Sequence, residues 1–369
     1  MRACFAPCAA MLIVVALVAL LVRHEPRVIY GAARPFAIVA LPDTQKYVKY
    51  DASESRAQIF RRQTEWIARN RDAYNIVFVT HEGDLVDNGA AYAIEWERAD
   101  AAMAVLDRAV PYSTVIGNHD YEQVGQRSSG AATYLRYFGP QRYQDYAWYG
   151  GASSDGLNQY QVFRAGDWTL LHLGLELEAR DGALAWAQSV LDAHRSLPTI
   201  ITTHAYQDDL NGRTMEPEFQ GNSGEKIWQK FVRKNPQIFM VLNGHFYKDD
   251  GERHQVSYND AGLPVFEIVA NYQNHLTYPN GGNGYLRLMT FDPAAGSITV
   301  RTYSPTANAY LSDADSEFSL AVDFKQRFGW DVALEPTPLP TPSPPPTAQQ
   351  SLWLPMIILD RSDMMGSGP

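Results

Sequence analysis

Apolar runs of strand length alternate with amphipathic segments through the first part of the chain. The runs are Phe36–Leu41, Asn75–Thr80 and Tyr112–Ile116. Between them, Ser53–Asn70 and Ala91–Arg108 carry apolar residues at helical spacing, and the first of these begins with a serine that suits a helix N-cap. Strands that alternate with helices indicate a parallel sheet whose faces are covered.

The second part of the chain is richer in strand. Strands are predicted at Gln159–Phe163, Trp168–Leu173, Thr199–Thr203, Ile238–Leu242, Val265–Ala270, Gly284–Phe291 and Ser297–Tyr303. Helices are predicted at Ala183–His194 and Ser223–Lys234. We expect His254 to lie in a solvated loop or to contact phosphate, and residues 271–275 to form a polar loop or to contact substrate. An α/β part followed by a strand-rich part predicts two packed sheets with helices outside.

The N-terminal residues 1–33 are typical of a targeting segment. Arg2 precedes an apolar run at Ala9–Val22, which is shorter than the ~20 residues that span a bilayer comfortably. A small-residue stretch at Gly31–Ala33 could serve for cleavage. We therefore expect export, through either a cleaved signal peptide or a retained membrane anchor. The predicted location is extracellular, cell-surface or membrane-anchored.

The C-terminal part differs in composition from the globular domain, which we expect at residues 34–330. Residues 331–350 contain a Pro-rich run, EPTPLPTPSPPPT, which cannot form a helix or a sheet ladder. Residues 351–369 follow as a short apolar tail that Pro355 interrupts. The tail is either a disordered end or a sorting or attachment signal. Both termini are candidates for membrane or cell-surface association, and no oligomeric state is predicted.

Charge and cysteine usage narrow the classes of function. The formal net charge is −10, which argues against a sequence-specific nucleic-acid binder. It leaves a phosphate substrate open, because bound divalent ions can dominate the local charge. The two cysteines, Cys4 and Cys8, precede the first apolar run. The globular part therefore has neither a disulfide framework nor a thiolate metal site.

Polar residues that can bind metal follow five of the predicted strands. They are Asp43, Asp84, Asn118, His204 and His245. Ligands of open α/β sheets bind beyond the carboxyl ends of the strands, so these residues are expected to converge. One short carboxylate can bridge two divalent ions about 3.5–4 Å apart. Carboxylate and amide oxygens suit hard ions, and imidazole suits Zn, Mn or Fe.

The motifs around these residues resemble those of the calcineurin-like metallophosphoesterases. GDLVDN begins at Gly83, GNHD begins at Gly117, a lone His204 follows, and Gly244 precedes His245. The DTQ at Asp43 is similar to that of a bacterial subgroup, whereas most members of the family carry D-x-H at this position. The resemblance covers roughly residues 36–305. It implies a four-layer αββα sandwich of two mixed β-sheets flanked by helices.

The resemblance implies two metal ions and assigns their ligands. Asp84 would bridge both ions, and Asp43 would bind the first. The second ion would be completed by Asn118, His204 and His245. The ions would be divalent or of mixed valence, drawn from Mn, Fe, Zn, Mg and Ca.

The resemblance also implies residues that act on the substrate. His119 would hydrogen-bond the substrate or protonate the leaving oxygen, and Asp120 would orient it. Asp87 and Asn88 are expected to shape the loop, and Asn88 is also a candidate for substrate contact. His81 is expected to be a satisfied interior histidine.

Two residues differ from the family pattern, and both stand where the family has ligands of the first ion. Gln45 stands where the family has the histidine of D-x-H, and Tyr247 stands where it has the last histidine of GHxH. Gln45 is either a ligand or a hydrogen-bond partner of one, and Tyr247 is either a ligand or part of the cleft wall. An all-oxygen first site would favour Mn, Mg, Ca or ferric iron over Zn. The alternative is a single ion at the second site.

These features predict an exported phosphoesterase. A metal-bound hydroxide would attack the phosphorus of a phosphate mono- or diester. The rival interpretation is a non-catalytic binding or surface-attachment module that keeps the fold with a degenerate first site. Gln45 and Tyr247 favour the rival, whereas the adjacent His119 and Asp120 favour an enzyme.

Overall fold

The computed structural model describes residues 34–273 and 279–330. The chain divides into two units, residues 1–334 and 335–369, and the described residues all belong to the first. The predicted targeting segment 1–33, linker 331–350 and tail 351–369 lie outside the described residues. Among the helices that the structure describes, none has the length and apolar character to cross a bilayer.

The first sheet is mixed and has seven strands in the order β15-β14-β13-β1-β2-β3, with β16 also paired to β14. Its strands are β1 (Phe36–Leu41), β2 (Ile76–His81), β3 (Tyr112–Thr114), β13 (Leu286–Asp292), β14 (Ser297–Ser304), β15 (Ala309–Tyr310) and β16 (Glu317–Ala321). β1, β2 and β3 are parallel, whereas β13 runs antiparallel to β1. The carboxyl ends of three consecutive strands therefore lie at one edge of this sheet.

The second sheet is also mixed, with the order β11-β12-β10-β7-β6-β5-β4. Its strands are β4 (Tyr149–Ala152), β5 (Gln159–Ala165), β6 (Trp168–Gly174), β7 (Thr199–Thr202), β10 (Ile238–Asn243), β11 (Glu252–Tyr258) and β12 (Pro264–Ala270). The four strands β6, β7, β10 and β12 are parallel. A separate two-stranded hairpin joins β8 (Gln207–Asp208) to β9 (Gly212–Arg213).

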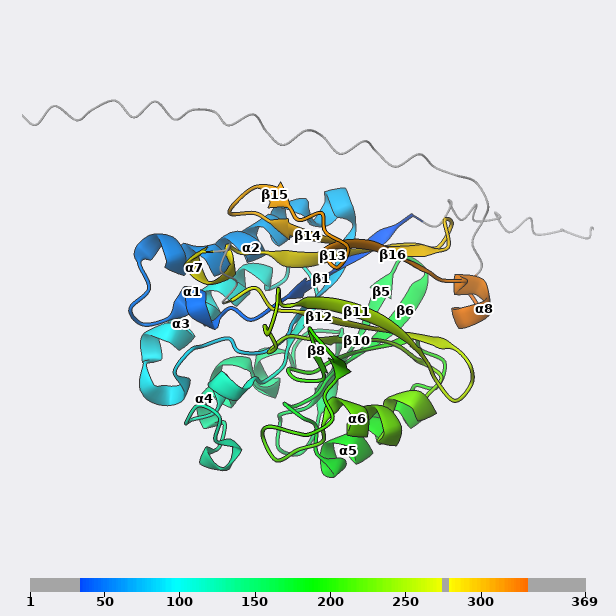
Figure 1. Cartoon of the computed structure of the whole chain (residues 1–369), viewed down its shortest axis with the longest axis horizontal. Coiled ribbons are helices and arrows are strands. Elements are labelled where there is room, and N and C mark those ends of the chain that lie inside the picture. The colour runs from blue at the N-terminus through cyan, green and yellow to red at the C-terminus, as the bar shows by residue number, and fades with distance from the viewer. Residues whose placement is uncertain (1–33, 274–278, 331–369) are drawn as a thin grey trace, which may run out of the picture. The chain divides into compact units, whose positions relative to one another are not determined.

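Helices cover the outer faces of the sheets (Figure 1). The α-helices of the described residues are α1 (Gln45–Val48), α2 (Glu54–Tyr74), α3 (Ala93–Met103), α4 (Ala132–Phe138), α5 (Asp181–Ala193), α6 (Gly224–Lys230), α7 (Pro279–Gly282) and α8 (Phe324–Phe328), and α8 packs on the core between the sheets instead. Figure 1 shows α2 outside the first sheet, and α5 and α6 outside the second. The predicted α/β architecture of two mixed sheets flanked by helices is confirmed.

Strand β1 shows why the sequence folds in layers. Every residue of β1 is buried, and successive side chains point to opposite faces. Val39 packs with Ile59 and Phe60 of α2 in one core cluster. Ile38 packs with Phe163 of the second sheet in another. A continuous apolar run in this central strand therefore serves both the helix layer and the layer between the sheets.

The main error of the sequence prediction is strand β11. His254 was expected in a solvated loop or in contact with phosphate, and no strand was predicted at residues 252–258, yet these residues pair antiparallel with β12 along the whole strand. Their sequence, ERHQVSY, is largely polar because β11 is the edge strand of its sheet. His254 accordingly lies on a strand, with its ring stacked on Phe318 at 3.8 Å between centroids and its Nδ1 2.8 Å from an oxygen of Asp315.

Candidate metal centre

Five loops meet where the two sheets come together at their carboxyl ends. Asp43, Asp84 and Asn118 follow β1, β2 and β3 of the first sheet, and His204 and His245 follow β7 and β10 of the second. The backbone N–H of His245 donates to Oδ1 of Asp43 at 3.1 Å, which joins the two sheets at this point. The five candidate ligands that follow predicted strands are thus brought together.

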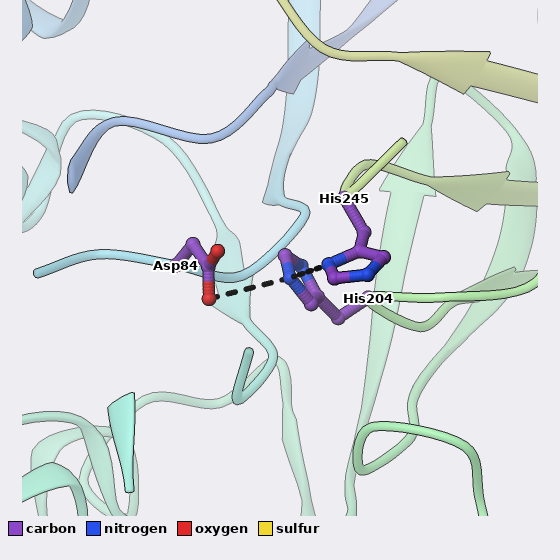
Figure 2. A group of neighbouring side chains, drawn as sticks. All are labelled: Asp84, His204 and His245. Atoms are coloured by element: carbon purple, nitrogen blue, oxygen red, sulfur yellow. Dashed lines mark hydrogen bonds and ion pairs between the residues drawn. The ribbon is translucent and has the colours of Figure 1, made fainter. Parts of the chain in front are cut away.

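Nε2 of His204 and three other potential ligand atoms lie close together. This nitrogen lies 3.3 Å from Oδ1 of Asp84, 3.1 Å from Oδ1 of Asn118 and 3.2 Å from Nδ1 of His245. Figure 2 shows Asp84, His204 and His245 pointing toward one another from different loops. Donor atoms that share one ion at about 2.0–2.2 Å lie roughly 3.0–3.5 Å from each other, so this spacing fits a bound cation.

Hydrogen bonds on the outer side of His204 and His245 determine which ring nitrogen of each carries a proton. Nδ1 of His204 lies 2.8 Å from the carbonyl oxygen of Glu82, and Nε2 of His245 lies 3.4 Å from Oε2 of Glu218. Both partners only accept hydrogen bonds, so each of these outward nitrogens carries the proton. The inward nitrogens then present lone pairs beside the oxygens of Asp84 and Asn118. In the neutral imidazoles these inward nitrogens, together with the oxygens of Asp84 and Asn118, form a group of converging acceptors that a bound cation would satisfy.

The pKa values of the residues in the centre also favour a bound cation. Burial would lower the pKa of His204, but the charges of Asp84 and Asp43 raise it to about 10. Burial opposes ionisation of Asp84 as well, yet His204 and His119 hold its pKa below the usual range. In Asp43, burial outweighs His204 and, together with the neighbouring Asp84, raises the pKa to about 7. The centre therefore attracts positive charge strongly, and a divalent ion would supply it.

Unusual backbone conformations bring the ligands close together. Asp84 and His245 have φ values of +53° and +68°, in the left-handed region that side chains other than glycine rarely adopt. A Cβ atom on Gly117 would lie 2.1 Å from Oδ1 of Asp84, and one on Gly244 would lie 2.1 Å from Oδ1 of Asp43. Gly117 precedes Asn118, and Gly244 precedes His245. Glycine is required at both positions because the backbone passes too close to a carboxylate for any larger residue.

The residues assigned to the first ion form a second group beside Asp84. Nε2 of Gln45 donates to Oδ2 of Asp84 at 3.0 Å, and both side chains are buried. The other amide atom, Oε1 of Gln45, is buried and finds no hydrogen-bond partner among the described residues. A buried, unpartnered oxygen on a side chain that contacts Asp84 fits an oxygen ligand of a hard cation.

Two residues that support Asp43 were missed as site residues. Nδ2 of Asn271 and Nε2 of Gln273 donate to Oδ2 of Asp43 at 2.9 and 3.1 Å. Asn271 also donates to the carbonyl oxygen of His245 at 2.8 Å. Both were placed in the stretch expected to be a polar loop or a substrate contact. Their position directly after β12, at the same edge of the sheet as β10, was the available signal.

Tyr247 differs from the other proposed ligands in its surroundings. Its residue is 45% exposed, whereas Asp43, Gln45, Asp84 and His204 are each at most 3% exposed. Whether its phenol binds the first ion or lines the entrance stays a prediction.

His119 is oriented by a different group from the one expected. Its Nδ1 lies 2.6 Å from the carbonyl oxygen of Asp87, while its backbone N–H donates to Asp84 at 2.9 Å. The carboxylate of Asp120 instead accepts N–H groups from Leu85, Val86 and Gly117 at 2.8–3.1 Å. Asp120 therefore ties together the loops that carry Asp84 and Asn118, and burial raises its pKa to about 7.

Two lysines of the α1 segment, Lys46 and Lys49, pair with Asp87 in the loop that follows Asp84. Asp87 accepts from Nζ of Lys46 at 2.6 Å and lies 3.6 Å from Nζ of Lys49. Asn88, a candidate for substrate contact, donates its amide to Glu95 at 2.7 Å, as a loop-shaping residue would.

His81 is buried as expected, with its Nε2 2.9 Å from the hydroxyl of Thr44, and burial lowers its pKa to about 3.

Comparisons with known proteins agree with the fold. Residues 36–265 match the family model described as calcineurin-like phosphoesterase. The chain is 34% identical over 304 residues to an uncharacterised Bacillus subtilis protein, YvnB, and the match covers 79% of this chain but 22% of YvnB. This chain thus spans about a fifth of the length of that curated relative.

Two solved structures share the fold. A dimetal phosphatase from Danio rerio matches with a TM-score of 0.51 and 13% identity, over 79% of this chain and 99% of that one. A purple acid phosphatase from yellow lupin seeds matches with a TM-score of 0.51 and 14% identity, over 84% of this chain and 58% of that one. Together with the match to the family model over most of the globular part, the fold and the converging site show that the chain belongs to the calcineurin-like phosphoesterase family.

Proposed function

We propose that this chain is an exported, metal-dependent phosphoesterase that hydrolyses phosphate mono- or diesters at the centre around Asp84. The observation that carries the proposal is the convergence of four acceptor atoms, from Asp84, Asn118, His204 and His245, on one point. Membership of the family supports phosphate esters as the class of substrate. The buried, unpartnered oxygen of Gln45 supports a second ion beside the first.

The two proposed ion sites differ in their donor atoms. Asn118, His204 and His245 would hold the second ion together with Asp84, through two nitrogens and two oxygens. Asp43, Gln45 and Asp84 would hold the first ion through oxygens alone, with Tyr247 as a further candidate. Bound divalent ions lower the pKa of water and offset the charge on phosphate oxygens. The oxygen-only set favours Mn, Mg, Ca or ferric iron, and the mixed set also accepts Zn.

Residues of the chain supply the remaining chemistry. Because Nδ1 of His119 donates to the carbonyl oxygen of Asp87, Nε2 is the nitrogen that is available to a substrate. Protonated at Nε2, His119 can hydrogen-bond the leaving oxygen and transfer its proton to it as the ester bond breaks. Lys46 and Lys49 provide positive charge next to this loop, where it would attract an anionic substrate.

Export is supported by the sequence of residues 1–33 alone. A basic start and a short apolar run are typical of a secretory signal, and either cleavage or retention as an anchor would place the globular part outside the membrane. Fractionation of cells that express the full chain, followed by protease treatment of intact cells, tests this part. Protein that stays in the cytoplasmic fraction would overturn it.

One experiment distinguishes the proposed enzyme from the rival interpretation, a binding module without catalysis. The purified chain is analysed for bound metal and then assayed with a chromogenic phosphate monoester and a chromogenic diester in added Mn²⁺. The proposal predicts turnover of at least one ester that a chelator abolishes. Bound metal without turnover, both in the natural chain and in a variant with Gln45→His and Tyr247→His, would favour the binding module.

A further inference from the structure

A short segment between β9 and α6 contacts the outer side of His245. Oε2 of Glu218 lies 3.4 Å from Nε2 of His245, and the ring of Phe219 meets the His245 ring edge-on at 5.6 Å between centroids. His245 presents its other nitrogen, Nδ1, toward His204. The segment therefore touches the nitrogen of His245 that faces away from the metal centre.

The segment is held by a buried carboxylate. Glu178 is 3% exposed and accepts backbone N–H groups from Glu218, from Phe219 at 2.8 Å and from Gly221 at 3.1 Å. Arg127 adds a hydrogen bond from its Nε to the carbonyl oxygen of Phe219 at 3.2 Å. Three donors on one carboxylate constrain the path of four residues, so the position of Glu218 is built into the fold.

Backbone strain at the anchor supports the same interpretation. Glu178 has a φ of +45° and Gln220 a φ of +63°, conformations that cost free energy in residues other than glycine. A Cβ atom on Gly221 would lie 1.9 Å from the carbonyl oxygen of Glu178, so the two chain segments approach as closely as backbone allows. Such strain persists only where surrounding contacts impose it, and here the outcome is the placement of Glu218 and Phe219 on His245.

We propose that Glu218 is a positioning residue for the second metal ion, and that Glu178 sets its position. Glu218 accepts the Nε2–H of His245, which fixes the tautomer that leaves a lone pair on Nδ1 and orients the ring toward His204. A carboxylate that accepts from a ligating histidine also raises the basicity of the ligand. The inference depends on the proposed metal centre, but it does not depend on turnover.

The size of the effect follows from the exposure of the carboxylate. Loss of such an outer partner typically weakens metal binding by about 10–100-fold. The side chain of Glu218 is 52% exposed, so water screens the contact. We therefore expect the low end of the range, about tenfold, for Glu218→Ala.

Cobalt binding provides the test, because the visible absorption of Co²⁺ reports its ligands independently of activity. The globular chain, freed of metal, is titrated with Co²⁺ in the natural form and as Glu218→Ala, Glu218→Gln and Glu216→Ala. Glu216 lies two residues away with an 85% exposed side chain whose nearest partner is Lys226 at 3.8 Å, so it is the matched control. We expect Glu218→Ala to weaken the histidine-containing site about tenfold and to shift its absorption, Glu218→Gln to restore most of the affinity, and Glu216→Ala to match the natural chain.

A second variant tests whether Glu178 sets the position of Glu218. Glu178→Gln keeps the size of the side chain but removes the charge that binds the three N–H groups, so it should weaken Co²⁺ binding by a similar factor while the far-ultraviolet spectrum stays unchanged. Unchanged affinity in Glu218→Ala, or equal weakening in Glu216→Ala, would overturn the inference. Cobalt bound without hydrolysis of any ester would refute the proposed enzyme and leave this inference standing.

Discussion

The side-chain amide of Gln45 donates to the carboxylate of Asp84 at 3.0 Å, while the carbonyl oxygen of the same amide is buried without a partner. A buried carbonyl oxygen without a partner, on a side chain that already holds Asp84, fits a ligand that completes its contacts with a cation. The first ion site would thus exist in spite of the missing histidine, with a preference for hard ions.

Replacement of Gln45 by leucine tests this account of the first site. We expect Gln45→Leu to reduce bound Mn²⁺ from about two ions to one per chain, because the second site keeps its four donor atoms. Metal content after gel filtration measures the change, and Gln229→Leu, at an exposed glutamine of α6, is the control. Two ions still bound to Gln45→Leu would remove Gln45 from the ligands.

His119 is predicted to act on the substrate without holding metal. His119→Ala should keep the metal content and lower kcat about 10²–10⁴-fold, the usual range for loss of a general acid. His254→Ala is a matched control, since this histidine packs on Phe318 and Asp315 instead. Equal loss of activity in both variants, or full activity in His119→Ala, would contradict the assignment.

Gly117 is predicted to be indispensable for a steric reason. In Gly117→Ala the new methyl group would lie 2.1 Å from Oδ1 of Asp84, so the carboxylate must move out of the centre. We expect metal binding to fall at least about tenfold, in line with displacement of a ligand. Gly182→Ala, where an added Cβ meets nothing within 4 Å, should bind metal normally. Isothermal titration with Mn²⁺ compares the two, and normal affinity in Gly117→Ala would show that the site adapts.

The pH dependence of stability should carry a contribution from His172, which lies between the sheets away from the metal ligands. Burial lowers its pKa from 6.5 to about 3, and its nitrogens bind Gln161 at 2.8 Å and Thr202 at 2.9 Å. Between these two pKa values the unfolded chain binds the proton and the folded chain does not, so stability falls as pH falls from 6.5 toward 3. At pH 5 the loss relative to pH 8 should be about 2 kcal/mol.

Urea unfolding of the metal-free chain at pH 5 and pH 8 measures this contribution. In His172→Gln, which keeps a donor and an acceptor, the difference in unfolding free energy between the two pH values should shrink by about 2 kcal/mol. A difference as large as that of the natural chain would show that other groups cause it.

Much of the fold followed from the sequence because local pattern and burial agreed. The predicted strand Phe36–Leu41 coincides with β1, and Ser53 caps α2 by accepting from Arg56. The polar edge strand β11 was missed, because its pairing with β12 is a long-range contact that leaves no apolar period. Helix α3 begins at Ala93 rather than at Ala91, because Gly89–Ala91 form a separate short 3-10 helix.

The site was predictable where a residue follows a strand within a motif, and less so where the contact is long-range. Asp84, Asn118, His204 and His245 meet as expected. The residues that hold the ligands in place could not be predicted from local sequence. Asn271 contacts Asp43 from a distant part of the sequence, and Glu218 contacts His245 from an irregular segment. The orientation of His119 by a backbone carbonyl oxygen also has no side-chain signature in the sequence.

The most direct test of the account is a crystal structure of the globular chain grown with Mn²⁺, with the ions located by anomalous scattering. The account predicts two peaks on either side of Asp84, about 3.5–4 Å apart. One should lie among Asn118, His204 and His245, and the other beside Asp43 and Gln45. Absence of any peak next to Asp84, or two ions bound elsewhere, would contradict it.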